Sequence, residues 1–313
     1  MENPLENLLE IRDRTAGQMQ AKVHIPKGQE LQVFELLEQR GVITWVAAKE
    51  VYSDVEGECL NGMFGVLKRG KYTNKGLPVL RVIMNLVPAN RLLEVIHGDV
   101  ALLPHGAAWI PLIVHGGEEL RVSQADMASA FYLFSIPQAW YKFMCFNFAA
   151  DGATLGKTPG VLFRPACRVL PMGWNSSVGI MQQLSRELLL SKGVPSNLEL
   201  HKGRPAPAWF VKSVQGASAN RTFWQVYLDN FMAAEHVDGA YHQGDIKLQE
   251  LAMRAWRSAG VLTAEDKQVL GAETAVELGV RLYGTAGLLG PLRNESSRQH
   301  WRLSGSSSFM EGP

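Results

Sequence analysis

Hydrophobic and polar positions along the chain predict a mixture of amphipathic helices and short strands. Apolar residues recur at helical spacing in stretches that each end at a glycine, over residues 29–41, 176–193 and 245–260. Strand-like apolar or alternating runs occupy residues 42–51 (which also suit a short helix), 62–86, 118–126, 141–152, 222–236 and 274–284. The chain is therefore expected to be an α+β protein.

The order of elements in the second half of the chain narrows this expectation. Between residues 118 and 284, a strand, a helix, a hairpin, a second helix and a closing strand or hairpin follow one another. This is the order of a split βαβ unit, an antiparallel sheet backed by helices. In such a sheet, Asp126 and Asp229 would lie at the ends of adjacent central strands.

Three further segments lack a strong pattern or differ in composition. Residues 1–40 are expected to form an N-terminal helical segment. Prolines and lost periodicity over residues 194–221 predict a long loop or an insertion. The polar, serine-rich residues 284–313 are expected to be a disordered tail.

Composition sets limits on the class of protein. The 313 residues are 46% hydrophobic, enough for one large domain or two modest ones, and the net charge of +1 neither requires nor excludes a nucleic-acid partner. The three cysteines are widely spaced, which argues against a disulfide framework and favours a reducing compartment. No histidine and cysteine share metal-ligand spacing, so structural zinc is not expected. The longest apolar region, residues 100–114, is interrupted by prolines and too short for a membrane span, so an intracellular protein in the cytoplasm or nucleus is expected.

The two aspartates at predicted strand ends are the main chemical signal. Carboxylates that meet across a sheet can hold two divalent cations, which activate an attacking oxygen and stabilise a leaving one in nucleotidyl transfer. Each residue also has a simpler interpretation. Asp229 and Asn230 suit the turn of a hairpin, because both residue types tolerate a positive φ. Asp126 suits the N-cap of a helix.

A second stretch, residues 151–159, resembles a phosphate-binding P-loop but departs from it. The pattern needs a glycine five residues before Gly156, and Asp151 stands there. A helix must follow Thr158, but Pro159 comes next. A hairpin turn is the better prediction for this stretch.

The sequence around the two aspartates resembles that of a reverse transcriptase of the retrotransposon type, over roughly residues 40 to 290. "LRVIMNLVPAN" resembles the fingers motif, with Arg81 as the arginine that meets the incoming triphosphate. "ADMASAFYLFSIP" resembles motif A, with Asp126 as a metal ligand and Phe131 as the aromatic residue that screens the sugar. "LPMGWNSSVGIMQ" resembles motif B, and "VYLDNF" resembles motif C. "SAGVLTAEDKQ" resembles motif D, whose lysine would be Lys267, and "ELGVRLYGTAGLLGP" resembles motif E.

The chain departs from these motifs at several positions. Asn85 stands where the fingers motif has Asp, and Val87 where it has Arg. Met172 replaces the usual Gln of motif B and Val178 the usual Pro. Asn230 replaces the second Asp of motif C. An asparagine keeps a carbonyl oxygen for a cation but loses the charge, so weaker metal binding is expected, and Asn230→Asp is predicted to raise polymerisation.

The resemblance implies a right-hand polymerase fold without a thumb. Residues 41–97 with 140–170 would form the fingers, and residues 98–139 with 171–283 a palm of ferredoxin-like split βαβ type. Ribonuclease H and integrase domains usually accompany such a module and are absent from this chain. The implied function is that of an RNA-directed DNA polymerase, a nucleotidyltransferase, from a retroelement, truncated and weakened by Asn230.

The resemblance also assigns roles to individual residues. The catalytic residues would be Asp126, Asp229 and Lys267, and the metal ligands Asp126, Asp229 and Asn230, holding two Mg²⁺ ions or Mn²⁺. The substrate-binding residues would be Arg81, Lys75, Phe131, Ala130, Met172, Gly173, Ser177 and Gln182. The nucleic-acid-binding residues would be Lys68, Arg69, Lys71, Tyr227 and Trp174. The expected partners are an RNA template, a DNA primer and a dNTP, with no membrane.

Alternatives remain open for the residues and for the whole chain. The basic residues of the fingers hairpin suit a solvated tip as well as a phosphate-facing surface. Lys267 suits a solvated helix flank, and Phe131 suits core packing. The rival function is a catalytically inactive, reverse-transcriptase-derived module that binds nucleic acid. An RNA-templated RNA polymerase would share the palm, but the bulk of Phe131 argues against it.

Overall fold

The computed structural model describes residues 3–15, 17–109, 117–204, 222–237, 244–286, 288–291 and 301–302. The chain divides into two compact units, of which unit 1 comprises Met1–His97 and Ser129–Ser177, and unit 2 comprises Gly98–Ala128 and Val178–Pro313. The sequence predicts the break after residue 97, but it assigns residues 129–139 and 171–177 to the palm, whereas they pack within unit 1. Most of the predicted proline-rich loop, residues 205–221, lies outside the described residues.

Unit 1 contains a three-stranded antiparallel sheet covered by one helix. The order is β1 (Ile43–Ala47), β8 (Leu162–Cys167) and β7 (Ala150–Asp151), and helix α1 (Glu30–Gln39) packs on β1. The ring of Phe34 on α1 stacks on Phe148, with the ring centroids 5.2 Å apart. The helix predicted over residues 29–41 and the hairpin turn predicted near Gly156 are confirmed. A small hairpin of β2 (Ser53–Asp54) and β3 (Gly57–Glu58) lies beside this sheet.

Two sequence predictions in unit 1 are wrong. Residues 141–152 form a strand only at Ala150–Asp151; before it comes a 3₁₀ helix, Gln138–Phe143. In this compact stretch Trp140, Phe143 and Phe146 are all buried, so the aromatic residues fill the core without the alternation of a strand. The N-terminal segment is not continuously helical either, because only the 3₁₀ turns Pro4–Asn7 and Ile11–Asp13 precede α1.

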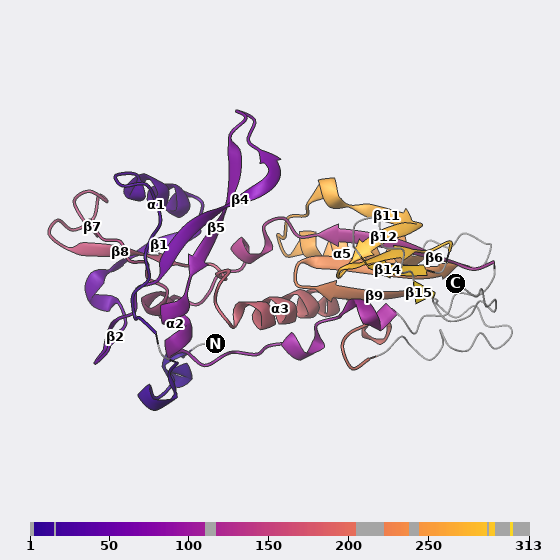
Figure 1. Ribbon diagram of the computed structural model, residues 1–313, viewed down its shortest axis with the longest axis horizontal. Helices are drawn as coiled ribbons and strands as arrows, with labels where there is room; N and C mark the ends of the chain where they lie inside the picture. Colours follow the sequence, from indigo (N-terminus) through magenta and orange to yellow (C-terminus); the bar gives the residue numbers. More distant parts are fainter. Residues whose placement is uncertain are drawn as a thin grey trace, which may run out of the picture. The chain divides into compact units, whose positions relative to one another are not determined.

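A long hairpin extends from unit 1. It consists of β4 (Gly62–Tyr72) and β5 (Pro78–Asn85), and helix α2 (Val87–Leu92) follows it. The hairpin was predicted over residues 62–86, and Figure 1 shows it rising from the rest of unit 1. Its outer half is exposed, so it is held mainly by the ladder between its own strands.

The central sheet of unit 2 has four antiparallel strands. Its spatial order is β11 (Val269–Ala272), β6 (Glu119–Asp126), β10 (Asn230–Val237) and β9 (Thr222–Tyr227). In chain order the unit runs β6, α3 (Ser177–Ser191), β9, β10, α5 (Gly244–Ser258) and β11. The predicted order of strand, helix, two strands, helix and strand is therefore confirmed, and β6 and β10 are the central pair.

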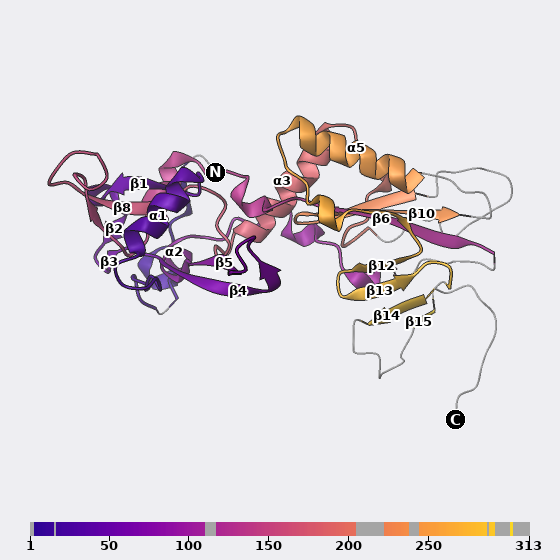
Figure 2. The same cartoon turned by 90° about the horizontal axis from the view of Figure 1, so that it is seen from above.

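Unit 2 is layered on both faces of this sheet. Helix α5 covers one face, where Phe231 of β10 meets Trp256 edge to face at 6.3 Å between ring centroids. The other face carries a small sheet of β12 (Thr274–Glu277), β13 (Val280–Tyr283), β14 (Leu288–Pro291) and β15 (Trp301–Arg302), as Figure 2 shows. Ala275 and Leu282 of this small sheet share one buried core with Val122, Met232 and Ala234.

Some predictions for unit 2 need correction. The tail from residue 284 is not wholly disordered, because Leu288–Pro291 pairs with β13 and Trp301–Arg302 pairs with β14. Helix α3 buries Met181 and Leu189, while Leu184, which lies at helical spacing in the same apolar pattern, is exposed. Among the described residues, the remaining 3₁₀ segments are Ala48–Glu50, Val100–Leu102, Gly106–Trp109, Ala130–Tyr132, Ser196–Leu198 and Glu265–Lys267.

The cysteines agree with an expectation from composition. All three cysteines are buried and carry free thiols, so no disulfide framework exists. Burial raises the pKa of the Cys145 and Cys167 thiols to about 12, which leaves them unreactive. Within the described ranges, no helix is both long and apolar enough to cross a bilayer.

Candidate functional site

The two candidate metal ligands lie at neighbouring strand ends of unit 2. Asp126 ends β6 and pairs with Asn230, the first residue of β10. Asp229 lies in the two-residue turn between β9 and β10, and its carbonyl oxygen accepts the N–H of Met127 at 2.8 Å. The predicted placement of Asp126 and Asp229 is therefore confirmed. The turn of this hairpin is therefore Leu228–Asp229, with the positive φ at Leu228, and not the Asp229–Asn230 pair that the sequence suggested, because Asn230 already belongs to β10.

A buried glutamine holds this turn in a strained conformation. Leu228 has a φ of 56°, which is costly for a bulky side chain. Its N–H donates to Oε1 of Gln182 at 2.9 Å, and Nε2 of Gln182 donates to the carbonyl of Val226 at 2.9 Å. Gln182 is 1% exposed. Both ends of its amide position the turn that carries Asp229, and its predicted contact with substrate stays a prediction.

Lys267 forms an ion pair with Asp126 and also experiences the charge of Asp229. The 3₁₀ segment Glu265–Lys267 is fixed beside β6 because the N–H of Ala264 donates to the carbonyl of Asp126 at 2.9 Å. Nζ of Lys267 forms an ion pair with the carboxylate of Asp126 at 2.5 Å. The pKa of Lys267 is raised, first by this hydrogen bond and further by the charges of Asp126 and Asp229. The three residues predicted to be catalytic therefore act on one another in unit 2.

Glu277 is a site residue that the sequence did not reveal. It ends β12, is 1% exposed, and accepts hydrogen bonds from Nδ2 of Asn230 at 3.0 Å and Nε2 of Gln124 at 2.8 Å. Nε2 of Gln225 also donates to it at 3.2 Å. The sequence did contain one signal that Glu277 would be buried. In a strand with period two, residue 277 shares the inward face of Ala275, and a carboxylate there must find partners.

The environment of Glu277 favours its protonated form. Burial raises the pKa of its carboxyl to about 7, and the charge of Asp126 acts in the same direction. The donated hydrogen bonds of Gln225, Asn230 and Gln124 oppose this shift, because they stabilise the carboxylate. Glu277 therefore changes charge near neutral pH.

This shift predicts a pH-dependent stability in the absence of divalent metal. The folded pKa lies above the ordinary value, so the contribution of Glu277 is fully present below about pH 4.5 and is lost as the pH rises to about 7. The free energy of unfolding should fall in this window by at most about 1.4 kcal/mol per pH unit. Urea unfolding of the wild type and Glu277→Gln across this range measures it. Parallel curves for the two proteins would contradict the shift.

Divalent metal fits this site only with ligands from outside the protein. Among the residues that the structure describes, no three His, Cys, Asp or Glu side chains gather to hold an ion. Two carboxylates, Asp126 and Asp229, and the amide oxygen of Asn230 are the oxygen donors at hand. Mg²⁺ typically binds one or two protein carboxylates and completes its shell with water and substrate phosphates. The donor set therefore fits Mg²⁺ or Mn²⁺, and metal binding stays a prediction.

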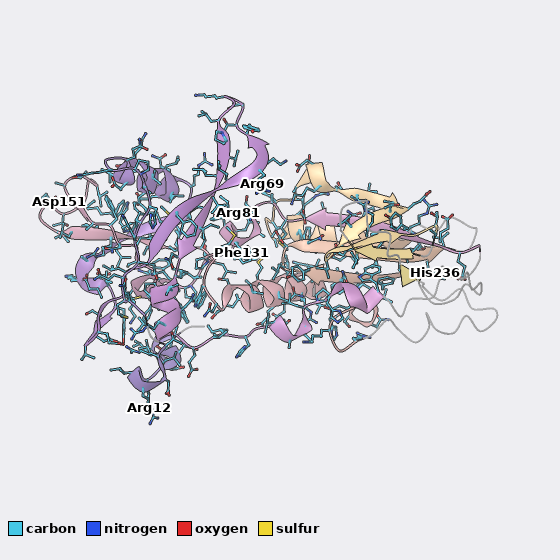
Figure 3. All side chains as sticks on the ribbon, viewed as in Figure 1. Arg12, Arg69, Arg81, Phe131, Asp151 and His236 are labelled. Atoms are coloured by element: carbon cyan, nitrogen blue, oxygen red, sulfur yellow. The ribbon has the colours of Figure 1, made fainter. Side chains whose placement is uncertain are left out.

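Most of the predicted substrate-binding residues lie in unit 1. Arg81 is exposed on β5, and Phe131 belongs to the 3₁₀ segment Ala130–Tyr132 (Figure 3). These two segments pack together, since the hydroxyl of Tyr132 donates to the carbonyl of Val82 at 3.2 Å. Burial raises the pKa of Tyr132, and the positive charge of Arg81 partly opposes the rise. Arg81 and Phe131 therefore come from adjoining segments, and their predicted roles toward the triphosphate and the sugar stay predictions.

The motif B loop is held by a residue that the sequence did not single out. Gly173 has a φ of 118°, and a Cβ built on it would lie 2.1 Å from the carbonyl oxygen of Met84. Nδ2 of Asn90 donates to the carbonyl of Gly173 at 2.8 Å, and its Oδ1 accepts the N–H of Asn175 at 2.9 Å. Asn90 is the last residue of the fingers motif, so the two motifs are joined by one side chain. Because it has no Cβ, Gly173 allows the backbone of the motif B loop to lie close to the backbone of β5.

Several residues that were predicted to contact a ligand are buried in unit 1. Ala130, Trp174 and Ser177 are at most 3% exposed. The ring of Trp174 lies against Trp140 with centroids 5.1 Å apart, and Oγ of Ser177 donates to the carbonyl of Pro171 at 2.7 Å. These side chains pack within the protein, and their predicted ligand contacts stay predictions. The roles predicted for the half-buried Met172 and Tyr227 stay predictions.

The basic residues of the fingers hairpin are exposed. Lys68, Arg69 and Lys71 lie on β4, and Lys75 lies in the turn before β5. Figure 3 shows Arg69 on the hairpin and Arg81 farther down it. This arrangement agrees with both a solvated tip and a phosphate-facing surface, so nucleic-acid binding by these residues stays a prediction.

Comparisons with known proteins find similarity in structure alone. No family model and no curated protein match the chain. A foamy viral protease-reverse transcriptase in complex with double-stranded DNA is 15% identical with a TM-score of 0.53. A prototype foamy virus protease-reverse transcriptase, in a CSH mutant form, is 17% identical with a TM-score of 0.51. A foamy viral protease-reverse transcriptase in complex with an RNA/DNA hybrid is 14% identical with a TM-score of 0.51.

The extent of these matches limits what they show. Each covers 89% of this chain, but the chain spans only 38%, 29% and 29% of the three structures. At such low identity the likeness concerns the fold alone. The chain thus has an α+β fold similar to that of viral reverse transcriptases.

Proposed function

We propose that this chain is an RNA-directed DNA polymerase module, which joins an incoming dNTP to the 3′-hydroxyl of a primer. One observation supports this most strongly. Asp126 and Asp229 lie at the ends of neighbouring central strands, together with Lys267, in a sheet of a fold similar to that of reverse transcriptases.

In this proposal unit 2 is the palm and unit 1 the fingers. The strand order β11, β6, β10, β9 is that expected of a ferredoxin-like split βαβ palm, and it supports the assignment. The exposed hairpin with its basic residues supports the assignment of unit 1. The fingers then include residues 129–139 and 171–177, which the sequence alone assigned to the palm.

Positioning and charge neutralisation are the main tasks of the protein in this reaction. Asp126 and Asp229, with the amide oxygen of Asn230, would hold the divalent cations. When bound, these cations neutralise the phosphates and stabilise the attacking and leaving oxygens. Lys267 would donate a proton toward the leaving pyrophosphate, since its raised pKa keeps it charged at neutral pH. Its ion pair with Asp126 must then open.

The remaining roles fall to unit 1. Arg81 would bind the triphosphate through its planar group of donors. The bulk of Phe131 would favour a deoxyribose over a ribose. Lys68, Arg69 and Lys71 would meet the phosphates of the template. The solved structures similar to this chain include complexes with double-stranded DNA and with an RNA/DNA hybrid, which supports an RNA template and a DNA primer here.

Primer extension tests the proposal. A DNA primer on an RNA template should be extended with dNTPs in the presence of Mg²⁺ or Mn²⁺, and chelation of the metal should stop the reaction. Ribonucleotides should be incorporated far less well, because Phe131 limits the space at the 2′ position. Equal use of both sugars would favour an RNA-templated RNA polymerase, and no extension with either metal would refute the proposal.

A binding module without catalysis is the second candidate. Two observations favour it: Asn230 stands in place of a carboxylate, and Lys267 occupies the carboxylate of Asp126. Such a module would bind an RNA/DNA duplex with the same affinity before and after Asp126→Asn, and it would extend no primer.

A further inference from the structure

One face of the central sheet carries the candidate metal ligands and a second polar row behind them. Asn230 pairs with Asp126, and two residues farther along β10, Met232 pairs with both Gln124 and Gln225. Paired residues of a sheet project to the same side, as do residues two apart on a strand. The two glutamines therefore lie on the face of Asp126 and Asn230, one row away from the strand ends.

Glu277 covers this second row from the small sheet. Its two carboxylate oxygens accept three amide N–H groups, from Gln124, Gln225 and Asn230. The three donors come from the three strands β6, β9 and β10. Because Glu277 is 1% exposed, these contacts take place away from bulk water. The β12–β13 hairpin thus delivers a carboxylate to the residue that follows Asp229.

The contact with Glu277 fixes the orientation of the Asn230 amide, that is, which of its two ends points away from Glu277. The two ends have nearly the same shape, but only the oxygen can ligate a cation. A carboxylate can only accept a hydrogen bond, so it selects the orientation in which Nδ2 points at Glu277. Oδ1 of Asn230 is then on the opposite side of the amide.

We propose that Glu277 is a positioning residue for Asn230, and that the two side chains together replace the second carboxylate of motif C. This inference rests on the proposed polymerase function and goes beyond it, because the second acidic side chain stands at residue 277 and reaches the site through its hydrogen bond with Asn230. An amide at 230 suits its neighbour, since two carboxylates 3.0 Å apart would repel each other.

If Asn230 and Glu277 act as a pair, substitutions at the two positions should have non-additive effects on stability and on metal binding. Asn230→Asp alone places a second carboxylate against Glu277. Glu277→Gln alone leaves one carbonyl oxygen for three amide donors, so an N–H group faces another N–H group. In the double variant, the glutamine can donate to the introduced carboxylate, and the pair is complementary again.

Two measurements that do not depend on catalysis test the pairing of Asn230 and Glu277. Thermal unfolding at pH 8 should show a Tm lowered by about 5 °C in Asn230→Asp and restored to within about 2 °C in the double variant. Titration of the protein with Mn²⁺ alone should show affinity about tenfold weaker in Glu277→Gln, and at least that of the wild type in the double variant. Glu273→Gln, an exposed substitution before the same hairpin, is the matched control and should change neither value.

The outcomes separate this inference from the polymerase proposal. Additive effects on Tm, an unchanged Mn²⁺ affinity in Glu277→Gln, or a wild type that binds no Mn²⁺ would each overturn the positioning role. If these measurements succeed and the wild type extends no primer, the polymerase proposal fails while the pairing of Asn230 and Glu277 stands. If primer extension succeeds and the effects of Asn230→Asp and Glu277→Gln on Tm are additive, only the pairing of Asn230 and Glu277 fails.

Discussion

Asp126→Asn is expected to lower metal-dependent primer extension by about 100-fold or more. The substitution keeps the shape of the side chain and one acceptor oxygen, but it replaces the other oxygen with a donating NH₂ group and removes one of two carboxylates at the strand ends. Charge stabilisation by bound cations is worth several kcal/mol, and each 1.36 kcal/mol changes the rate tenfold. The rate of single-nucleotide addition at saturating Mg²⁺ measures the loss.

The variant should fold like the wild type, so the loss can be assigned to chemistry. The ion pair that it removes involves Lys267, whose side chain is 55% exposed, and such pairs contribute little to stability. Asp151→Asn is the matched control, because the carboxylate of Asp151 accepts the N–H of Ala153 in the β7–β8 turn and the amide oxygen of an asparagine can do the same. An Asp126→Asn protein that keeps more than half of the wild-type rate would contradict the assignment of Asp126.

Gly173→Ala is expected to destabilise unit 1 by about 3 kcal/mol or more. The φ of 118° is unfavourable for any side chain, and the new Cβ would lie 2.1 Å from the carbonyl oxygen of Met84. Met84 belongs to β5 and pairs with Met63 of β4, so its carbonyl cannot move without disturbing the hairpin. Thermal unfolding should show a Tm lower by roughly 6 °C or more.

Gly57→Ala separates the two contributions. Gly57 has a φ of 115° in the same unit, and nothing lies within 4 Å of a Cβ built on it. This control carries the backbone strain alone and should cost about 1–2 kcal/mol. If both variants lose the same stability, the close approach to Met84 contributes nothing, and Gly173 would need another explanation, such as contact with a ligand.

The structure reverses one expectation about motif C. From the sequence alone, Asn230→Asp restores a missing carboxylate and should raise polymerisation. In the fold, the side chain of Asn230 donates to Glu277, 47 residues away, and a carboxylate in its place would meet another carboxylate. A gain is therefore expected only when Glu277→Gln accompanies it.

Local patterns in the sequence determined much of the fold. Helices α1, α3 and α5, the β4–β5 hairpin and the order of elements in unit 2 follow from periodicities of 3.6 and 2 and from glycine stops, which depend only on nearby residues. The same local signals placed Asp126 and Asp229 at strand ends, and the sheet order then made them neighbours.

Tertiary structure alone decided which side chains of the recognised motifs are buried within the protein. Gln182 and Trp174 belong to a recognisable motif, but their burial depends on strands and loops distant in the chain. The compact stretch 141–152, the clamp of Asn90 on Gly173 and the contact of Glu277 with Asn230 arise in the same way. Each partner of a buried polar group is fixed by packing between distant segments, and no periodicity in the sequence records that choice.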